Sequence, residues 1–151
     1  MSLYDWAFRK LLDLHQFTYV HSGGRTGQKW LGVTTLLLRS TGRRSGLERT
    51  NALIHAKDGG DYVLVASNGG ANIAPSWYFN VRANPLVSVQ VGRTRYEGRA
   101  TIIARGDGEY DRLWRLINDD NSDRYVRYQH KTERPIPLVV VTPALSSPGG
   151  R

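Results

Sequence analysis

The spacing of apolar residues along the chain divides it into an N-terminal helical part and a longer part built of short strands. Between residues 3 and 18, apolar residues recur every three or four positions, and charged residues occupy the other side. This spacing is typical of an amphipathic helix and predicts one over 3–18. Residues 21–27 contain three glycines and predict a loop.

Beyond this loop, the chain consists mainly of short segments rich in Val, Ile, Thr and Leu, which turn residues separate. Such segments predict strands, and the glycines at Gly59, Gly60 and Gly92 predict two hairpins. The predicted strands cover residues 30–39, 50–57, 61–67, 86–91, 94–104 and 136–142. Two helices are expected between them, over 74–82 and 107–118, and the acidic first turn of the second suits the helix dipole.

The links between consecutive strands predict the fold. Most of them are too short for a helical crossover, so neighbouring strands should pair antiparallel. A small sheet protects its edges best when it curls on itself. The sequence therefore predicts a mainly β (α+β) protein, a split antiparallel β-barrel with peripheral helices. We expect a single domain over residues 1–143, which includes the helix at 3–18, and a flexible tail over 144–151.

Composition narrows the function classes. The chain has 151 residues, of which 40% are hydrophobic and 23% charged, as expected for one globular domain. It has no cysteine, which excludes disulfides, thiolate metal sites and a cysteine nucleophile. Its four histidines lack metal-ligand spacing, so we expect no metal. Charges interrupt the N-terminus and no apolar run approaches the roughly 20 residues of a membrane span, so we expect a cytoplasmic location.

The net charge of +8 indicates an anionic partner, unless it serves only solubility. Positive charge is densest between Arg39 and Arg49, where four arginines lie within eleven residues beside glycines and hydroxyl side chains. Backbone N–H groups, hydroxyls and guanidinium groups together suit a phosphate. The alternative is a solvated, charged hairpin loop. Neither a Walker motif nor a Rossmann fingerprint is present.

Two further segments could line a ligand site. The small residues 66–71 end a predicted strand and would let a ligand approach the backbone, and the next helix carries Trp77, Tyr78 and Asn80. Aromatic faces beside amides suit a flat heterocycle, although an aromatic such as Trp77 could equally belong to the core. Tyr125 and Tyr128 are candidates for a pocket mouth or belong to a polar helix end.

Three segments, LLLRSTGRRSGLERTN (36–51), VASNGG (65–70) and PSWYFNVRANP (75–85), together resemble the deazaflavin-dependent nitroreductase and quinone reductase family of actinobacteria. The resemblance runs from about residue 30 to 143. It implies a split β-barrel that binds coenzyme F-420, an 8-hydroxy-5-deazaflavin. The implied reaction transfers a hydride from the reduced coenzyme to an organic acceptor such as a quinone or a nitroaromatic compound.

The resemblance also implies which residues form the site. The loop of Arg43, Arg44 and Ser45 would meet the phosphate and oligoglutamate tail of the cofactor, and Tyr128 would close over the pocket. The full implied cofactor-binding set is Arg43, Arg44, Ser45, Arg49, Thr50, Asn51, Ala52, Leu53, Ala66, Ser67, Asn68, Gly69, Ser76, Trp77, Tyr78, Phe79, Asn80 and Tyr128. The candidate catalytic residues are Ser67, which would stabilise negative charge on the acceptor, and Tyr128 and Tyr125, which would shield the site or donate a proton.

Two positions depart from the pattern of the family. Asn68 stands where family nitroreductases often carry a lysine, and Lys131 stands near the place of a third tyrosine, so the acceptor wall differs. The alternatives are an FMN-binding split-barrel enzyme and a non-enzymatic basic barrel that binds nucleic acid. Nucleic acid is not expected, because aromatic and basic residues do not interleave along one strand face. The helix at 3–18 either packs on the barrel or lies on the inner face of the cell membrane. The physiological acceptor and the oligomeric state are left open.

Overall fold

The computed structural model describes residues 29–30 and 33–144. The helix predicted over 3–18, with its packing or membrane contact, and the loop over 21–27 lie outside these residues. So does the predicted tail after residue 144.

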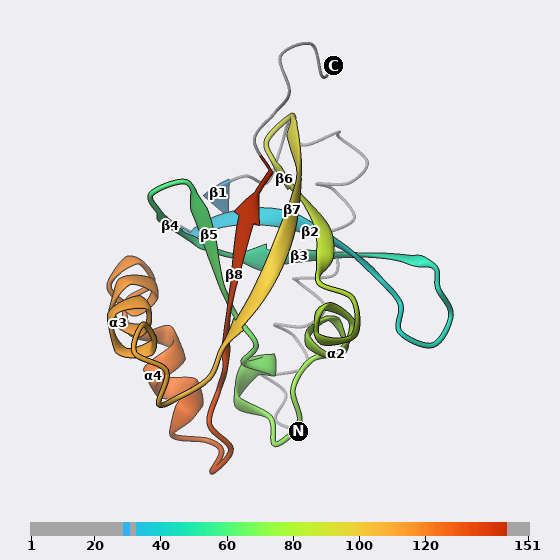
Figure 1. Cartoon of the computed structure of the whole chain (residues 1–151). Coiled ribbons are helices and arrows are strands. Elements are labelled where there is room, and N and C mark those ends of the chain that lie inside the picture. The colour runs from blue at the N-terminus through green and yellow to red at the C-terminus, as the bar shows by residue number, and fades with distance from the viewer. Residues whose placement is uncertain (1–28, 31–32, 145–151) are drawn as a thin grey trace.

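One antiparallel sheet forms the body of the molecule (Figure 1). Its strands follow the order β1-β2-β6-β7-β8-β5-β4, and β3 pairs with β2 off this path. The strands are β1 (Lys29–Trp30), β2 (Val33–Thr41), β3 (Glu48–Ile54), β4 (Ala56–Asp58), β5 (Asp61–Val65), β6 (Leu86–Val91), β7 (Thr94–Ile103) and β8 (Leu138–Pro143). The sheet curls, so that β2 and β3 cross behind β7 and β8 (Figure 1).

Helices flank the sheet on two sides. The helical segments are η1 (Asn68–Gly70), α2 (Ser76–Ala83), α3 (Tyr110–Asp120) and α4 (Arg124–Gln129). The pair α3 and α4 lies beside β8, and α2 lies on the opposite side of the sheet, next to the β2–β3 hairpin (Figure 1). None of the helices in the described part of the chain is long and apolar enough to cross a membrane.

The apolar residues of the central strands are buried on both faces. Along β8, Val139 and Val141 point into the barrel, whereas Leu138 and Val140 point toward α3 and α4. The barrel core comprises Leu36, Leu38, Tyr62, Leu64, Ala66, Trp77, Val81, Val87, Val89, Ala100, Val139 and Val141. Two-sided burial explains why these strands read as nearly continuous apolar runs instead of alternating ones.

The architecture matches the predicted one, a mainly β fold of antiparallel strands with peripheral helices, and differs from it locally. The strand expected over 50–57 is divided into β3 and β4 at His55, whose N–H donates to the Thr34 carbonyl at 3.1 Å. The short helix α4 was not predicted. Its first turn is capped from another helix, because Asn118 Oδ1 accepts from the N–H groups of Tyr125 at 3.0 Å and Val126 at 3.1 Å.

Candidate cofactor site

The arginine-rich segment forms a closed turn between β2 and β3. The Gly42 N–H donates to the Leu47 carbonyl, and the Gly46 N–H donates to the Gly42 carbonyl, both at 2.8 Å. A Cβ atom at Gly42 would lie 2.6 Å from Ser45 Oγ and 3.2 Å from the Leu47 carbonyl oxygen, so a larger residue at this position would have to displace the Ser45 side chain. Ser45 Oγ accepts the Leu47 N–H at 3.1 Å. We call residues 42–49 the arginine loop; it is an ordered turn.

The arginine loop is docked on helix α2. Asn80 Oδ1 accepts both the backbone N–H of Arg43 and its Nη1, each at 3.1 Å. Arg43 Nη1 also lies 3.4 Å from the Ser76 carbonyl oxygen, and its guanidinium lies 5.1 Å from the centre of the Phe79 ring. The arginine loop and α2 are far apart in the sequence and were assigned to one site only by prediction. The structure places them in direct contact.

The guanidinium groups of this region lack acidic partners. Arg44 is exposed and forms no hydrogen bond or ion pair with any residue that the structure describes. The side chain of Arg49 donates to Ser45 Oγ at 3.3 Å. Arg82, which the sequence prediction missed, lies 5.0 Å from the same Phe79 ring as Arg43. Arg82 follows Phe79 by three positions, which places both side chains on one face of the helix, and this spacing could have identified it.

Three arginines elsewhere on the same sheet and on α3 have carboxylate partners. Arg39 and Arg95 each lie 3.7 Å from Glu48, and Arg112 lies 2.9 Å from Asp58. The four guanidinium groups at the arginine loop and α2 thus stand without carboxylates among the residues described. Such a surface attracts a polyanion.

A second feature, the turn of residues 67–70, follows β5. Ser67 is in the right-handed helical region, with φ −79° and ψ −34°, and the next three residues all have positive φ: 47° at Asn68, 65° at Gly69 and 85° at Gly70. A right-handed residue followed by a left-handed one turns successive backbone N–H groups toward one point and forms an anion-binding nest. The N–H groups of Ser67 and Asn68 have no acceptor within the described residues.

Helix α4 forms a wall beside this turn, which we call the Ser67 turn. A Cβ atom at Gly70 would lie 2.7 Å from the Tyr128 carbonyl oxygen, so glycine allows the close approach. Tyr128 is half-buried and its ring meets that of Tyr125 edge to face, with 5.9 Å between the centres. Tyr125 is only 4% exposed, and burial raises the pKa of its phenol well above the usual value. Of the two candidate tyrosines, Tyr128 is therefore the more accessible to a ligand.

The remaining predicted residues fall into three environments. Thr50, Asn51, Ala52 and Leu53 lie half-buried on β3, in register with residues 36–39 of β2. Trp77 is 4% exposed inside the barrel core, as the core interpretation of this residue anticipated, and Ala66 is fully buried there too. Ser76 is exposed at the start of α2, and Tyr78 is half-buried.

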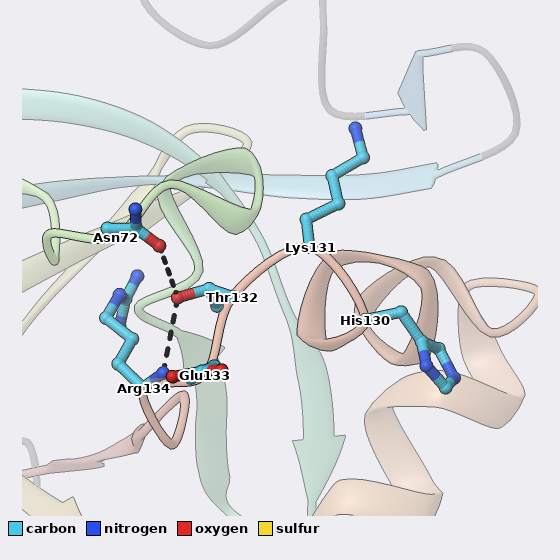
Figure 2. A pocket seen from close by; sticks show the side chains of 6 residues that line it. All are labelled: Asn72, His130, Lys131, Thr132, Glu133 and Arg134. Atoms are coloured by element: carbon cyan, nitrogen blue, oxygen red, sulfur yellow. Dashed lines mark hydrogen bonds between the residues drawn. The ribbon is translucent and has the colours of Figure 1, made fainter.

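A shallow hollow of about 530 Å³ adjoins the Ser67 turn. It is lined by Asn72, His130, Lys131, Thr132, Glu133 and Arg134 (Figure 2). Thr132 Oγ1 donates to Asn72 Oδ1 at 2.9 Å, whereas the side chains of His130 and Lys131 point away from this pair (Figure 2). The sequence analysis named Lys131 as part of the altered acceptor wall, and it did not include the other five residues.

Comparison with known proteins identifies the family. The model of the F420H(2)-dependent quinone reductase family matches residues 11–143. An F420H(2)-dependent quinone reductase of Mycobacterium tuberculosis is 42% identical over 134 residues, which cover 88% of this chain and 90% of that protein.

Two solved structures extend the comparison. The structure of an F420-H2 dependent reductase (FDR-A) has 39% sequence identity and a TM-score of 0.64, over 71% of this chain and 92% of that one. HutZ, a heme storage protein from Vibrio cholerae, has 11% identity and a TM-score of 0.57, over 87% and 92% of the two chains, and shows the fold alone. The predicted split-barrel fold and family resemblance are thus confirmed. The chain belongs to the F420H(2)-dependent quinone reductase family, and its function is the reduction of a quinone by the reduced F-420 coenzyme.

Proposed function

We propose that the arginine loop, α2 and the Ser67 turn hold coenzyme F-420, and that the quinone is reduced beside Ser67 and Tyr128. The observation that carries this proposal is the set of guanidinium groups without carboxylate partners, docked through Asn80 on the helix that bears Tyr78. The donor set fits the coenzyme's chemistry. It offers cations for a phosphate and an acidic tail, and unused N–H groups for the polar edge of a flat ring.

The arginine loop is suited to the anionic end of the coenzyme. Asn80 and Phe79 hold Arg43 in place before any ligand arrives, which lowers the entropy lost on binding. Arg44 and Arg49 carry the remaining charge, and the Ser45 hydroxyl lies between the loop backbone and Arg49. Charge-assisted hydrogen bonds of this kind are about twice as strong as neutral ones.

The Ser67 turn is suited to the ring end. Two backbone N–H groups, from Ser67 and Asn68, are unused within the described chain and point to one side of the turn. Donors fixed before the reaction stabilise negative charge that develops in the transition state. The coenzyme supplies the hydride when bound. We assign Ser67 the role of hydrogen-bond donor to the acceptor oxygen, and Tyr128 that of covering the site and excluding water.

The acceptor wall favours a quinone over a nitro compound. Asn68 replaces the lysine that is frequent in nitroreductases, and its Nδ2 donates to the Ile73 carbonyl at 3.0 Å. The side chain thus brings no cation to the acceptor, and its amide already has a partner within the turn. We expect quinones such as menadione to be reduced faster than nitroimidazoles, because the lysine that is frequent at this position in nitroreductases is absent here.

The test is a fluorescence titration of the purified protein with oxidised F-420, with FMN in parallel. The double variant R43A/R44A should bind F-420 at least ~10-fold more weakly, since two charge-assisted contacts are lost even after water screens part of each. The control variant is Arg115→Ala, an exposed arginine on α3. An unchanged affinity in R43A/R44A, or tighter binding of FMN than of F-420 to the natural protein, would contradict the proposal.

A further inference from the structure

A single guanidinium group holds the backbone of the Ser67 turn. Arg134 Nη2 donates to the carbonyl oxygens of Ala66 at 3.2 Å and Ser67 at 2.9 Å, and its Nε donates to the Ala71 carbonyl at 2.8 Å. Arg134 is half-buried and forms no ion pair with any residue that the structure describes. Its charge is therefore compensated by backbone carbonyls, which come from both ends of the turn.

These contacts act on the same peptide units that offer the unused N–H groups. The carbonyl of Ala66 and the N–H of Ser67 belong to one peptide unit, and the carbonyl of Ser67 and the N–H of Asn68 belong to the next. Neither peptide bond is cis, so each N–H points away from its carbonyl and thus away from Arg134. A cation on the carbonyl side also draws electron density from the amide and makes its N–H a stronger donor.

Arg134 is itself held in place by the segment that follows α4. Gln129 Nε2 donates to the carbonyls of Thr132 at 3.2 Å and Arg134 at 2.9 Å, and its Oε1 accepts the Ile136 N–H at 3.0 Å. Thr132 Oγ1 accepts the N–H of Arg134 at 3.3 Å and donates to Asn72, beyond the turn (Figure 2). The backbone on both sides of the guanidinium is therefore fixed before any ligand binds.

We propose that Arg134 is the positioning residue of the Ser67 turn: by holding the carbonyl of Ser67 and the flanking carbonyls of Ala66 and Ala71, it aims the N–H groups of Ser67 and Asn68 at the ring end of the coenzyme. The expected effect of this role on F-420 binding rests on the proposed function. The geometry of the turn itself does not depend on that function, so the two can be tested separately. A contact that served only global stability would change the unfolding free energy without changing the turn in the folded protein.

The first measurement is amide hydrogen exchange of the ligand-free protein, followed in peptides that cover residues 66–72. The N–H groups of Gly70 and Ala71 are hydrogen-bonded to the carbonyls of Ser67 and Asn68 at 2.9 and 3.2 Å, so they report on the order of the turn. In Arg134→Ala they should exchange at least ~10-fold faster under conditions in which the protein stays folded. Arg134→Lys, which keeps the charge and loses the fork, should lie between.

The second measurement is rescue. Millimolar guanidinium chloride should slow the exchange in Arg134→Ala and restore F-420 affinity, and sodium chloride at equal ionic strength should do neither. The matched control is Arg127→Ala, because Arg127 Nη1 donates to the Ser122 carbonyl at 2.6 Å, just before α4, and the side chain forms no hydrogen bond with the described residues of the turn. Its variant should leave exchange over 66–72 and F-420 binding as they are.

Each outcome decides between the two proposals. Faster exchange in Arg134→Ala together with at least ~10-fold weaker F-420 binding and rescue supports both. Faster exchange and rescue in a protein whose natural form does not bind F-420 supports the positioning role and overturns the cofactor assignment. Exchange in Arg134→Ala and Arg134→Lys that equals that of the natural protein overturns the positioning role, whatever happens to the melting temperature.

Discussion

Replacement of Asn80 separates two properties of the arginine loop, its docking and its charge. The side chain is 5% exposed, and its Oδ1 accepts one neutral and one charged donor from Arg43, each at 3.1 Å. Asn80→Ala removes both bonds, whose net contributions to stability are about 1 kcal/mol for the neutral bond and about 1.5–3 kcal/mol for the charged one. Because Arg43 is exposed and regains water, we expect a net loss of about 1–2 kcal/mol in the free energy of unfolding.

Asn80→Asp should behave differently. The carboxylate has nearly the shape of the amide and keeps an oxygen acceptor for Arg43, so the loop should remain docked and the stability should stay within about 0.5 kcal/mol of the natural value. The new negative charge, however, neutralises Arg43 where an anionic ligand would need it. F-420 affinity should therefore fall in both variants, whereas stability should fall only in Asn80→Ala.

The assay combines urea unfolding, followed by tryptophan fluorescence, with F-420 titration of each variant. The control is Asn84→Ala at the end of the same helix, where Oδ1 accepts only the exposed Leu86 N–H at 3.1 Å. Natural stability and affinity in Asn80→Ala would refute the docking argument. Natural affinity in Asn80→Asp would refute the electrostatic argument, because it would show that the charge of Arg43 does not contribute to binding.

Two further predictions concern a buried histidine and the turn glycines. Burial, with a smaller contribution from Lys57, lowers the pKa of His55 from 6.5 to about 4, so the unfolded chain binds this proton first as the pH falls. Stability should therefore fall between pH ~6.5 and ~4, by roughly 3 kcal/mol at most, and His55→Phe should flatten this part of a urea-midpoint profile against pH. Gly70→Ala meets the Tyr128 carbonyl at 2.7 Å and has a φ of +85°, whereas Gly69→Ala, with a φ of +65°, meets nothing within 4 Å. Thermal melts and F-420 titrations should show a large loss in Gly70→Ala and a loss of only about 1 kcal/mol in Gly69→Ala, and equal losses would contradict the packing of α4 on the turn.

The fold was predictable where local rules decide it. Turn glycines and short apolar segments located the hairpins, and the shortness of the links required antiparallel pairing. The break at His55 was not predictable, because the residue belongs to a continuous run by composition and bonds to Thr34 on another strand. Helix α4 was missed for the same reason: its cap is the side chain of Asn118, from the preceding helix.

The residues that would contact the cofactor were largely predictable from the sequence. The residues that hold them in place were not. The arginine loop and the Ser67 turn were recognisable in the sequence, because a dense group of arginines and glycines is typical of a loop that binds an anion. Arg134 does not stand out, since it is one arginine among many and its partners Ala66 and Ser67 lie 68 and 67 positions away. Asn80 was expected to touch the cofactor, but its Oδ1 is occupied by Arg43, a distinction that spacing along the chain cannot express.

The position of β8 in the sheet has a consequence for the folding pathway. This strand pairs with both β5 and β7, and among the described strands it alone links β4 and β5 to the rest of the sheet. Until Leu138–Pro143 leaves the ribosome, the facing edges of β5 and β7 have no partner within the described chain. Closure must therefore follow synthesis of nearly all of the described residues. Such a high contact order predicts folding in milliseconds to seconds, with transient strand edges that a chaperone would need to cover.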